Sequence, residues 1–91
     1  MRFELGNVYM THGIANAREK DFGFLLEVEK AFQRYTREDF GELCEEDIKA
    51  NEEAIECGLR ILGCYNTSKG DIYIITEADR SCTTILFCDE Y

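Results

Sequence analysis

Apolar and polar residues alternate in three short runs over the last third of the chain. The runs lie at 60–65, 72–77 and 83–88, and polar, turn-forming segments at 66–71 and 78–81 separate them. Short apolar runs of period two with turn residues between them are typical of antiparallel strands joined by tight connections. We therefore expect a three-stranded antiparallel meander in this part of the chain.

The first part of the chain has helical periodicity instead. Thr11 and Asp21 stand directly before two predicted helices, at 12–19 and 22–35, where their side chains can act as N-caps. In the second helix apolar residues recur every three or four positions and form a wide stripe. This helix is therefore expected to be the main cover of the core.

A third helix is predicted at 45–57, where acidic residues fill the first turn and Gly58 follows the last one. Its inner face carries Ile48 and Ile55, with Asn51 between them. A buried amide needs hydrogen-bond partners. We expect Asn51 to tie this helix to a loop or to the end of a strand, and a functional role for Asn51 is the alternative.

A weak alternation at 3–10 predicts a short first strand, with a bulge at residues 6 and 7, that adds to an edge of the sheet. The whole pattern predicts an α+β fold, in which two or three N-terminal helices pack on one face of a three- to four-stranded antiparallel meander sheet. A chain of 91 residues can build one core, so a single domain, 1–91, is expected.

Acidic residues give the chain a net charge of −9, and most of this charge lies at 36–57. Nucleic acids and anionic membranes attract basic surfaces, so we expect direct contact with neither. The expected partner is a basic protein surface, and plain solubility is the alternative explanation of the charge. The carboxylates predicted to face this partner are Glu38, Asp39, Glu42, Glu45, Glu52, Glu53 and Glu56.

Other features of the sequence exclude several classes of chemistry. No stretch has the character of a membrane span or a signal peptide, so a cytoplasmic location is expected. The five cysteines are odd in number and include no closely spaced pair, so we expect buried thiols and neither a zinc site nor another metal site. Motifs for phosphate loops and serine nucleophiles do not occur, and no cofactor is expected.

One turn of the predicted meander gathers groups that could do chemistry. It places charged and hydroxyl side chains at one end of apolar strands: Thr76, Glu77, Asp79, Arg80 and Ser81. Acid–base chemistry or anion binding here, helped by Tyr65 or His12, is one hypothesis. The favoured interpretation is structural: Asp79 caps the backbone and Arg80 pairs with a neighbouring acid.

Two segments of the chain carry a family resemblance. Residues 74–81 read Ile-Ile-Thr-Glu-Ala-Asp-Arg-Ser, and residues 39–43 read Asp-Phe-Gly-Glu-Leu. With Glu90 and Tyr91 at the end, they resemble a family of short proteins encoded on bacterial plasmids and integrative conjugative elements, often described as plasmid-related proteins. The resemblance covers most of residues 36–91.

The chain departs from this family at a few positions. Phe40 and Tyr73 stand where the family has tryptophan, Cys88 replaces a proline, and Cys44 replaces a polar N-cap. These changes are typical of packing substitutions. The family has no established activity, so the resemblance implies a setting, a mobile genetic element in a bacterial cytoplasm, and no mechanism.

Three hypotheses follow from the sequence. The leading one is a non-enzymatic protein-interaction module of a mobile element, with inhibition of a host defence system or mimicry of nucleic acid as its specific forms. The second is a small enzyme or ligand-binding protein that uses the 76–81 turn. It includes a ribonuclease-toxin-like fold, although such toxins need a basic groove and acidic residues here outnumber basic ones by 19 to 10. The third is a homodimer formed through an exposed edge of the sheet.

Overall fold

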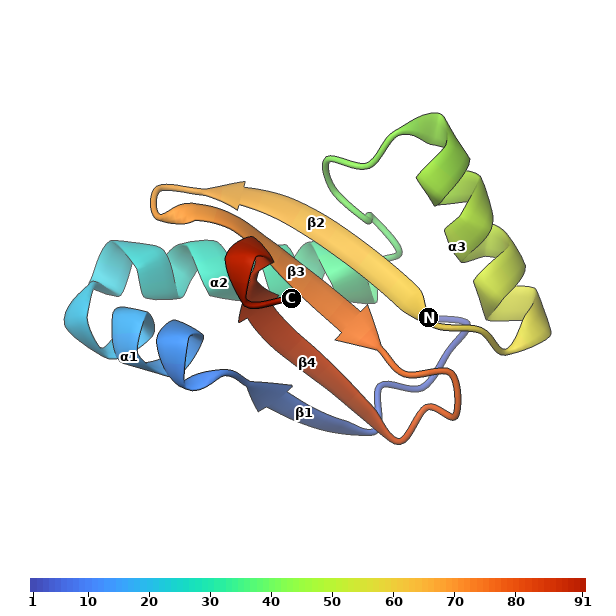
Figure 1. The fold of residues 1–91 in the computed structure, drawn as a ribbon, viewed down its shortest axis with the longest axis horizontal. Coiled ribbons are helices and arrows are strands. Elements are labelled where there is room, and N and C mark those ends of the chain that lie inside the picture. Colours follow the sequence, from blue (N-terminus) through green and yellow to red (C-terminus); the bar gives the residue numbers. More distant parts are fainter.

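Four strands form one sheet in the computed structural model, which describes residues 1–91 (Figure 1). The strands are β1 (Asn7–Met10), β2 (Ile61–Thr67), β3 (Gly70–Thr76) and β4 (Cys82–Phe87). They lie in the order β1-β4-β3-β2, and the last three form the predicted antiparallel meander. With three helices before this meander, the α+β prediction is confirmed.

The first strand corrects the prediction of a purely antiparallel sheet, because β1 pairs with β4 in parallel. Three helices and two strands separate them in the chain, so no hairpin imposes an antiparallel direction. The N–H of Asn7 donates to Ser81 O at 3.1 Å, and that of Thr11 donates to Ile85 O at 3.0 Å. The strand is also shorter than predicted, because Gly6 has φ +64° and ends the extended conformation just before Asn7.

Three helices precede the meander, and a short 3-10 turn follows it: α1 (His12–Lys20), α2 (Phe22–Thr36), α3 (Glu45–Cys57) and η1 (Cys88–Glu90). The first two begin at the predicted caps, since Thr11 accepts from the N–H of Ile14 and Asp21 accepts from that of Phe24. Gly58 ends α3 in the left-handed conformation. Helix α2 lies behind the sheet in Figure 1, and α1 lies next to α2 beyond the ends of β1 and β4, whereas α3 lies beside the edge strand β2.

The core lies between α2 and the sheet. Its buried side chains include Phe24, Val28, Ala31 and Tyr35 from α2 and Ile61, Ile72, Ile74 and Ile85 from the strands. The predicted apolar stripe of α2 included Phe22 and Leu26 and was too wide, because these side chains are 72% and 52% exposed. A straight helix turns only one face toward a sheet, and these two side chains lie outside that face.

A chain of buried hydroxyl groups crosses this core. Thr83 donates to the carbonyl oxygen of Leu5 at 2.7 Å, and its Oγ1 lies 2.8 Å from that of Thr76. The Oγ1 of Thr76 in turn lies 2.6 Å from the Tyr35 hydroxyl. Each hydroxyl has one proton to donate, so Tyr35 donates to Thr76 and Thr76 donates to Thr83. The chain thus joins α2, β3, β4 and the N-terminal segment without an unpaired polar group.

The Asn51 side chain closes the outer edge of β2. Its amide nitrogen donates to Leu62 O at 2.7 Å, and its oxygen accepts from the Leu62 N–H at 3.1 Å. The side chain therefore pairs with the edge strand as a neighbouring backbone would. This confirms the prediction that Asn51 ties α3 to the sheet. The prediction that Ile48 lies on the same inner face is wrong, because Ile48 is 41% exposed.

The segment before α3 closes the same edge of β2 at Cys64, two residues after Leu62. Cys64 N–H donates to Phe40 O at 3.0 Å, and Glu42 N–H donates to Cys64 O at 2.7 Å. Gly41 lies between these two contacts with φ +79°, and a Cβ atom there would collide with the Cys64 carbonyl oxygen. Only glycine permits this backbone approach. Phe40 is buried, so this segment is a packed corner of the fold.

Replacement of Asn51 tests the closure of this edge. Asn51→Ala leaves the N–H and C=O of Leu62 without partners beside a packed helix, so the free energy of unfolding should fall by about 1–3 kcal/mol. Urea unfolding followed by circular dichroism measures the change. The matched control is Asn16→Ala on the exposed side of α1, which should stay within about 0.5 kcal/mol of the wild type. Equal effects of the two substitutions would contradict this role of Asn51.

The buried Tyr35 predicts a loss of stability at alkaline pH. Burial raises the pKa of Tyr35 from its usual value near 10 to about 12. The unfolded chain therefore releases this proton at a lower pH than the folded protein does. The contribution of Tyr35 is fully present below about pH 10 and is lost as the pH rises toward 12, by about 2–3 kcal/mol.

Urea unfolding between pH 9 and pH 12 measures this dependence. Tyr35→Phe should be less stable than the wild type at neutral pH, because Thr76 loses its donor. Its stability should fall less steeply above pH 10, because the replaced side chain has no proton to release. Parallel pH profiles of the two proteins would show that Tyr35 does not carry the effect.

Candidate functional site

The 76–81 turn joins β3 to β4, and most of its polar groups serve internal contacts. Thr76 is fully buried in the hydroxyl chain described above. Asp79 accepts from the backbone N–H of Ser81 at 3.0 Å, which confirms its predicted role as a cap. The hydrogen bonds from Ser81 hold the pKa of Asp79 below its usual value. Glu77 is half-buried and joins this turn through its backbone, which bonds to Cys82 and Arg80.

The side chain of Arg80 holds the end of α3. Its Nη1 lies 2.7 Å from Leu59 O and its Nη2 lies 3.1 Å from Ala54 O. Nη1 also contacts Glu77 O at 3.0 Å, and the guanidinium lies over the ring of Phe3. The prediction that Arg80 pairs with an acid is wrong, because its guanidinium binds carbonyl oxygens at the C-terminal end of α3, where the helix dipole attracts a cation. Both terminal nitrogens of Arg80 thus already donate to carbonyl oxygens within the protein.

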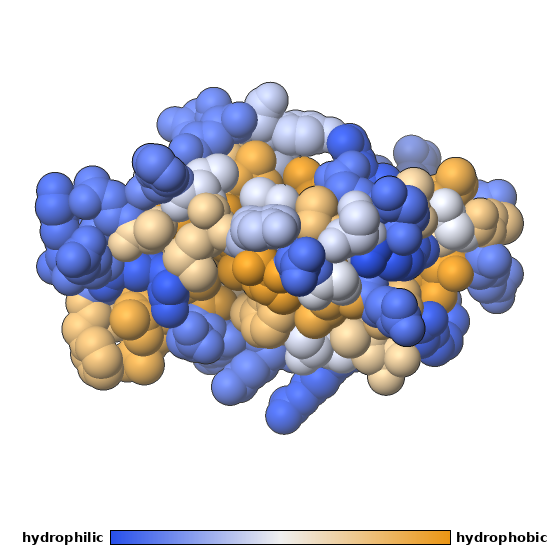
Figure 2. Space-filling view, turned by 90° about the horizontal axis from the view of Figure 1, so that it is seen from below, coloured by the Kyte–Doolittle hydropathy of each residue, from blue (hydrophilic) through white to orange (hydrophobic).

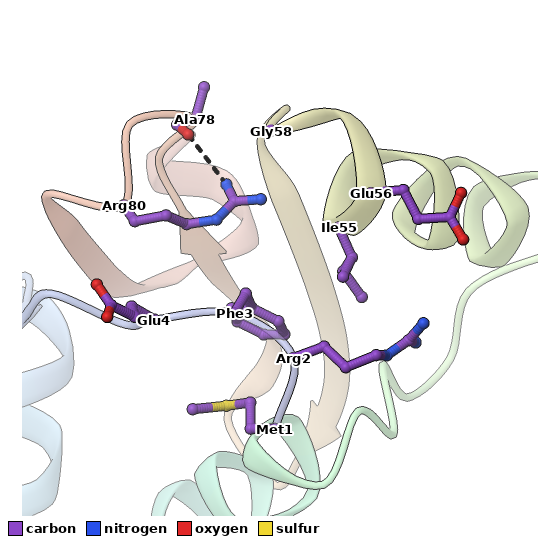
Figure 3. Close-up of a pocket in the computed structure, with 9 residues that line it drawn as sticks. All are labelled: Met1, Arg2, Phe3, Glu4, Ile55, Glu56, Gly58, Ala78 and Arg80. Carbon is purple, nitrogen blue, oxygen red and sulfur yellow. Dashed lines mark hydrogen bonds between the residues drawn. The ribbon is translucent and has the colours of Figure 1, made fainter.

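An open depression of about 420 Å³ lies next to Arg80, between the N-terminal segment and the end of α3 (Figure 3). Its lining includes Arg2, Phe3 and Glu4 from the N-terminal segment and Glu56 from α3. Figure 3 shows Phe3 between Arg80 and Arg2, with Arg2 extended along α3. The guanidinium groups of both arginines are held by other groups of the protein, and the depression also presents the carboxylates of Glu4 and Glu56.

The other residues proposed for this site lie elsewhere. His12 is exposed on α1 beside Asn16 and Glu19. Tyr65 is buried, donates to Asp39 O at 2.7 Å and faces a hollow with residues of α2. The structure does not bring His12, Tyr65 and the 76–81 turn into one cavity. A general base and a nucleophile are therefore not within reach of each other here.

The seven predicted partner-facing carboxylates divide into two groups. Four of them are in ion pairs within the protein: Glu38 and Glu52 with Arg2, and Asp39 and Glu42 with Arg34. Arg2 lowers the pKa of Glu38, and Arg34 lowers that of Asp39. The Nη2 of Arg2 lies 2.8 Å from an oxygen of Glu52, so this arginine joins α3 to the end of α2.

The remaining three carboxylates, Glu45, Glu53 and Glu56, are exposed and form no ion pair in the structure. They belong to the outer face of α3, which we define as Glu45, Lys49, Glu52, Glu53 and Glu56. All five side chains of this face are exposed. The exposed apolar side chain of Ile48 lies on the same helix. The outer face of α3 therefore presents free carboxylates next to an apolar contact point.

Sequence reasoning did not identify the part played by Arg2. This residue binds Glu38 with both its backbone N–H and its guanidinium, at 2.9 and 2.8 Å, although the two are far apart in the chain. No local pattern marks such a pair. The only signal in the sequence was the small number of basic residues available for many acidic ones.

Predictions from the sequence also concerned the cysteines, metal binding and membrane spans. All five cysteines are free, and none is fully buried, so the prediction of buried thiols is wrong. No group of three or more His, Cys, Asp or Glu side chains is arranged to hold a metal ion. None of the helices combines the length and the apolar character needed to cross a membrane.

Loss of the Arg80 contacts should loosen α3. Arg80→Met keeps an unbranched side chain over Phe3 but removes every donor, so the free energy of unfolding should fall by about 2 kcal/mol. Amide hydrogen exchange near residues 54–59 should accelerate as well. The control is Arg37→Met, since Arg37 is exposed and forms no ion pair. Unchanged exchange at 54–59 in Arg80→Met would contradict this role.

Comparison with known proteins adds no relative to this description. No protein-family model, no curated protein and no solved structure matches the chain. Two features of the molecule remain as a basis for function: the outer face of α3, with its free carboxylates, and the depression beside Arg80.

Proposed function

We propose that the protein is a non-enzymatic interaction module that binds a basic protein surface through the outer face of α3. The observation that carries this proposal is the state of Glu45, Glu53 and Glu56, which are exposed and unpaired on one helix. The 76–81 turn, in contrast, uses its polar groups in contacts within the fold. Free carboxylates are available to a partner, whereas engaged ones must first lose their present contacts.

The arrangement of α3 suits association in a second respect. Arg80, Asn51 and Arg2 hold the helix through contacts at residues 51–54, in its C-terminal half. The free carboxylates therefore stand on a helix whose orientation is set before a partner arrives, which lowers the entropy cost of binding. Ile48, at 41% exposure, can add an apolar contact at the edge of the charged surface.

The proposed setting is a mobile genetic element in a bacterium, which rests on the resemblance of residues 36–91 to plasmid-related proteins. In that setting a basic, nucleic-acid-binding host factor is a suitable partner. Inhibition of a host defence protein and mimicry of nucleic acid are two forms of the same proposal. Both require an acidic surface that competes for a basic one.

The enzyme or ligand-binding alternative finds less support in the geometry. It requires Glu77, Asp79 and Arg80 to converge in a cavity with Tyr65 or His12. Asp79 is exposed, Arg80 is bound to carbonyl oxygens, and the other two lie in separate parts of the molecule. We therefore do not base the proposed function on this turn.

Charge reversal on α3 tests the proposal. The variant Glu45→Lys/Glu53→Lys/Glu56→Lys should lose capture of basic proteins from a bacterial lysate, and the association rate with a captured partner should fall about tenfold or more at low salt. The wild type should itself bind more slowly as the salt concentration rises.

A matched control separates local charge from net charge. Glu19→Lys/Asp71→Lys/Asp89→Lys changes the net charge equally at exposed positions outside α3. This control should keep the wild-type partner. If both triple variants lose the partner equally, or if neither does, the outer face of α3 is not the binding surface.

A further inference from the structure

The two edges of the sheet differ in a way that points to a second surface. The outer edge of β2 is closed by Asn51 and by the segment before α3. Strand β1 is the opposite edge, and no strand lies beyond it. Asn7 and Thr11 direct their N–H groups to β4. Because backbone groups alternate along a strand, Val8 and Met10 direct their N–H and C=O groups outward.

The side chains around this open edge are mostly apolar. Val8 is 44% exposed and Tyr9 is 54% exposed. A groove of about 160 Å³ runs between β1 and α2, lined by Val8, Met10, Val28, Glu29, Phe32 and Ile85. Figure 2 shows the molecule from the side on which β1 lies, and apolar atoms extend across the middle of this view. An open backbone edge next to an apolar groove is a template for an added strand.

The charge around β1 favours a second copy of this chain as the occupant. Residues 7–11 carry no charge, and the nearby Glu29 is paired with Arg18 at 3.0 Å. The carboxylate of Glu90, at the end of β1, accepts from the Thr11 hydroxyl and from the Phe87 N–H, both at 2.8 Å. Strand β2 lies three strand spacings, or about 14 Å, from β1, and the free carboxylates of α3 lie beyond β2. This exceeds the screening length of about 8 Å at physiological ionic strength. Two copies, each with a charge of −9, can therefore meet at β1 with the free carboxylates of α3 held apart.

The strand is also complementary to itself. In an antiparallel pair arranged about a two-fold axis through Tyr9, Val8 of each copy lies opposite Met10 of the other. Both outward N–H groups and both outward C=O groups of each copy then find partners. Tyr9 faces Tyr9 of the second copy on the side of the sheet away from α2, and Val8 and Met10 meet over the apolar groove.

We propose that the protein forms a symmetric homodimer in which the β1 strands of two copies pair antiparallel and extend the sheet across the molecule. The dimer leaves α3 at the two far ends, with both outer faces open. It is independent of the function proposed for α3, since neither surface includes residues of the other.

Sedimentation equilibrium and light scattering over a range of concentrations test this dimer. The wild type should approach twice the monomer mass of 10.5 kDa as its concentration rises. Val8→Lys places a charge at the edge, and Tyr9→Lys places two like charges opposite each other on the axis. Each variant should raise the dissociation constant about tenfold or more.

The control is Ile48→Lys, which changes an apolar side chain of similar exposure on α3 and should dimerise as the wild type does. Circular dichroism and urea unfolding verify that each variant is folded. Because Val8 and Tyr9 lie at the rim of the fold, at least one of the two variants should retain the wild-type spectrum. A wild type that stays monomeric up to about 1 mM, where the binding free energy is only about −4 kcal/mol, would overturn the proposal. It would equally fail if both β1 variants dimerise as the wild type does, or if Ile48→Lys weakens the dimer to the same degree.

Discussion

The pair of hydrogen bonds between the Asn51 side chain and the backbone of Leu62 determines where α3 lies. It seals the edge of β2 and turns the inner side of α3 toward the sheet. The opposite side of the helix, with Glu45, Glu53 and Glu56, must then face away from the protein. One buried amide thus decides both which edge of the sheet is closed and which carboxylates are free.

The attachment of α3 depends on polar contacts, because the helix buries little apolar surface. Asn51 and Ala54 are its only fully buried residues. Two residues outside glycine have positive φ, Glu38 at 62° and Arg80 at 60°, a conformation that costs roughly 1–2 kcal/mol per residue. Glu38 binds the arginine that also binds Glu52, and Arg80 binds the end of α3. In both cases charge-assisted hydrogen bonds offset the cost of the backbone conformation.

The helices and strands of this fold could be predicted from the sequence, because they depend on the preferences of residues that are close together in the chain. Thr11, Asp21 and Gly58 mark helix ends through side-chain or backbone preferences that act within a few residues. The direction of β1 relative to β4 could not be predicted, since it depends on where β4 lies after the rest of the chain has folded. Arg80 shows the same limit at the site: the acid Asp79 precedes it in the sequence, yet its guanidinium also reaches the carbonyl oxygens of Leu59 and Ala54, which are more than twenty positions away.

The free carboxylates and the unpaired backbone groups lie at opposite edges of the sheet. The carboxylates of α3 lie beyond β2, while the uncharged β1 lies at the other edge. An acidic surface repels another copy of itself, so association of like chains requires a region from which that charge is removed. The fold provides such a region at β1, and it does so without neutralising α3. A dimer built there would present two acidic faces to a basic partner, and engagement of the first face would raise the effective concentration of the second wherever the partner spans both.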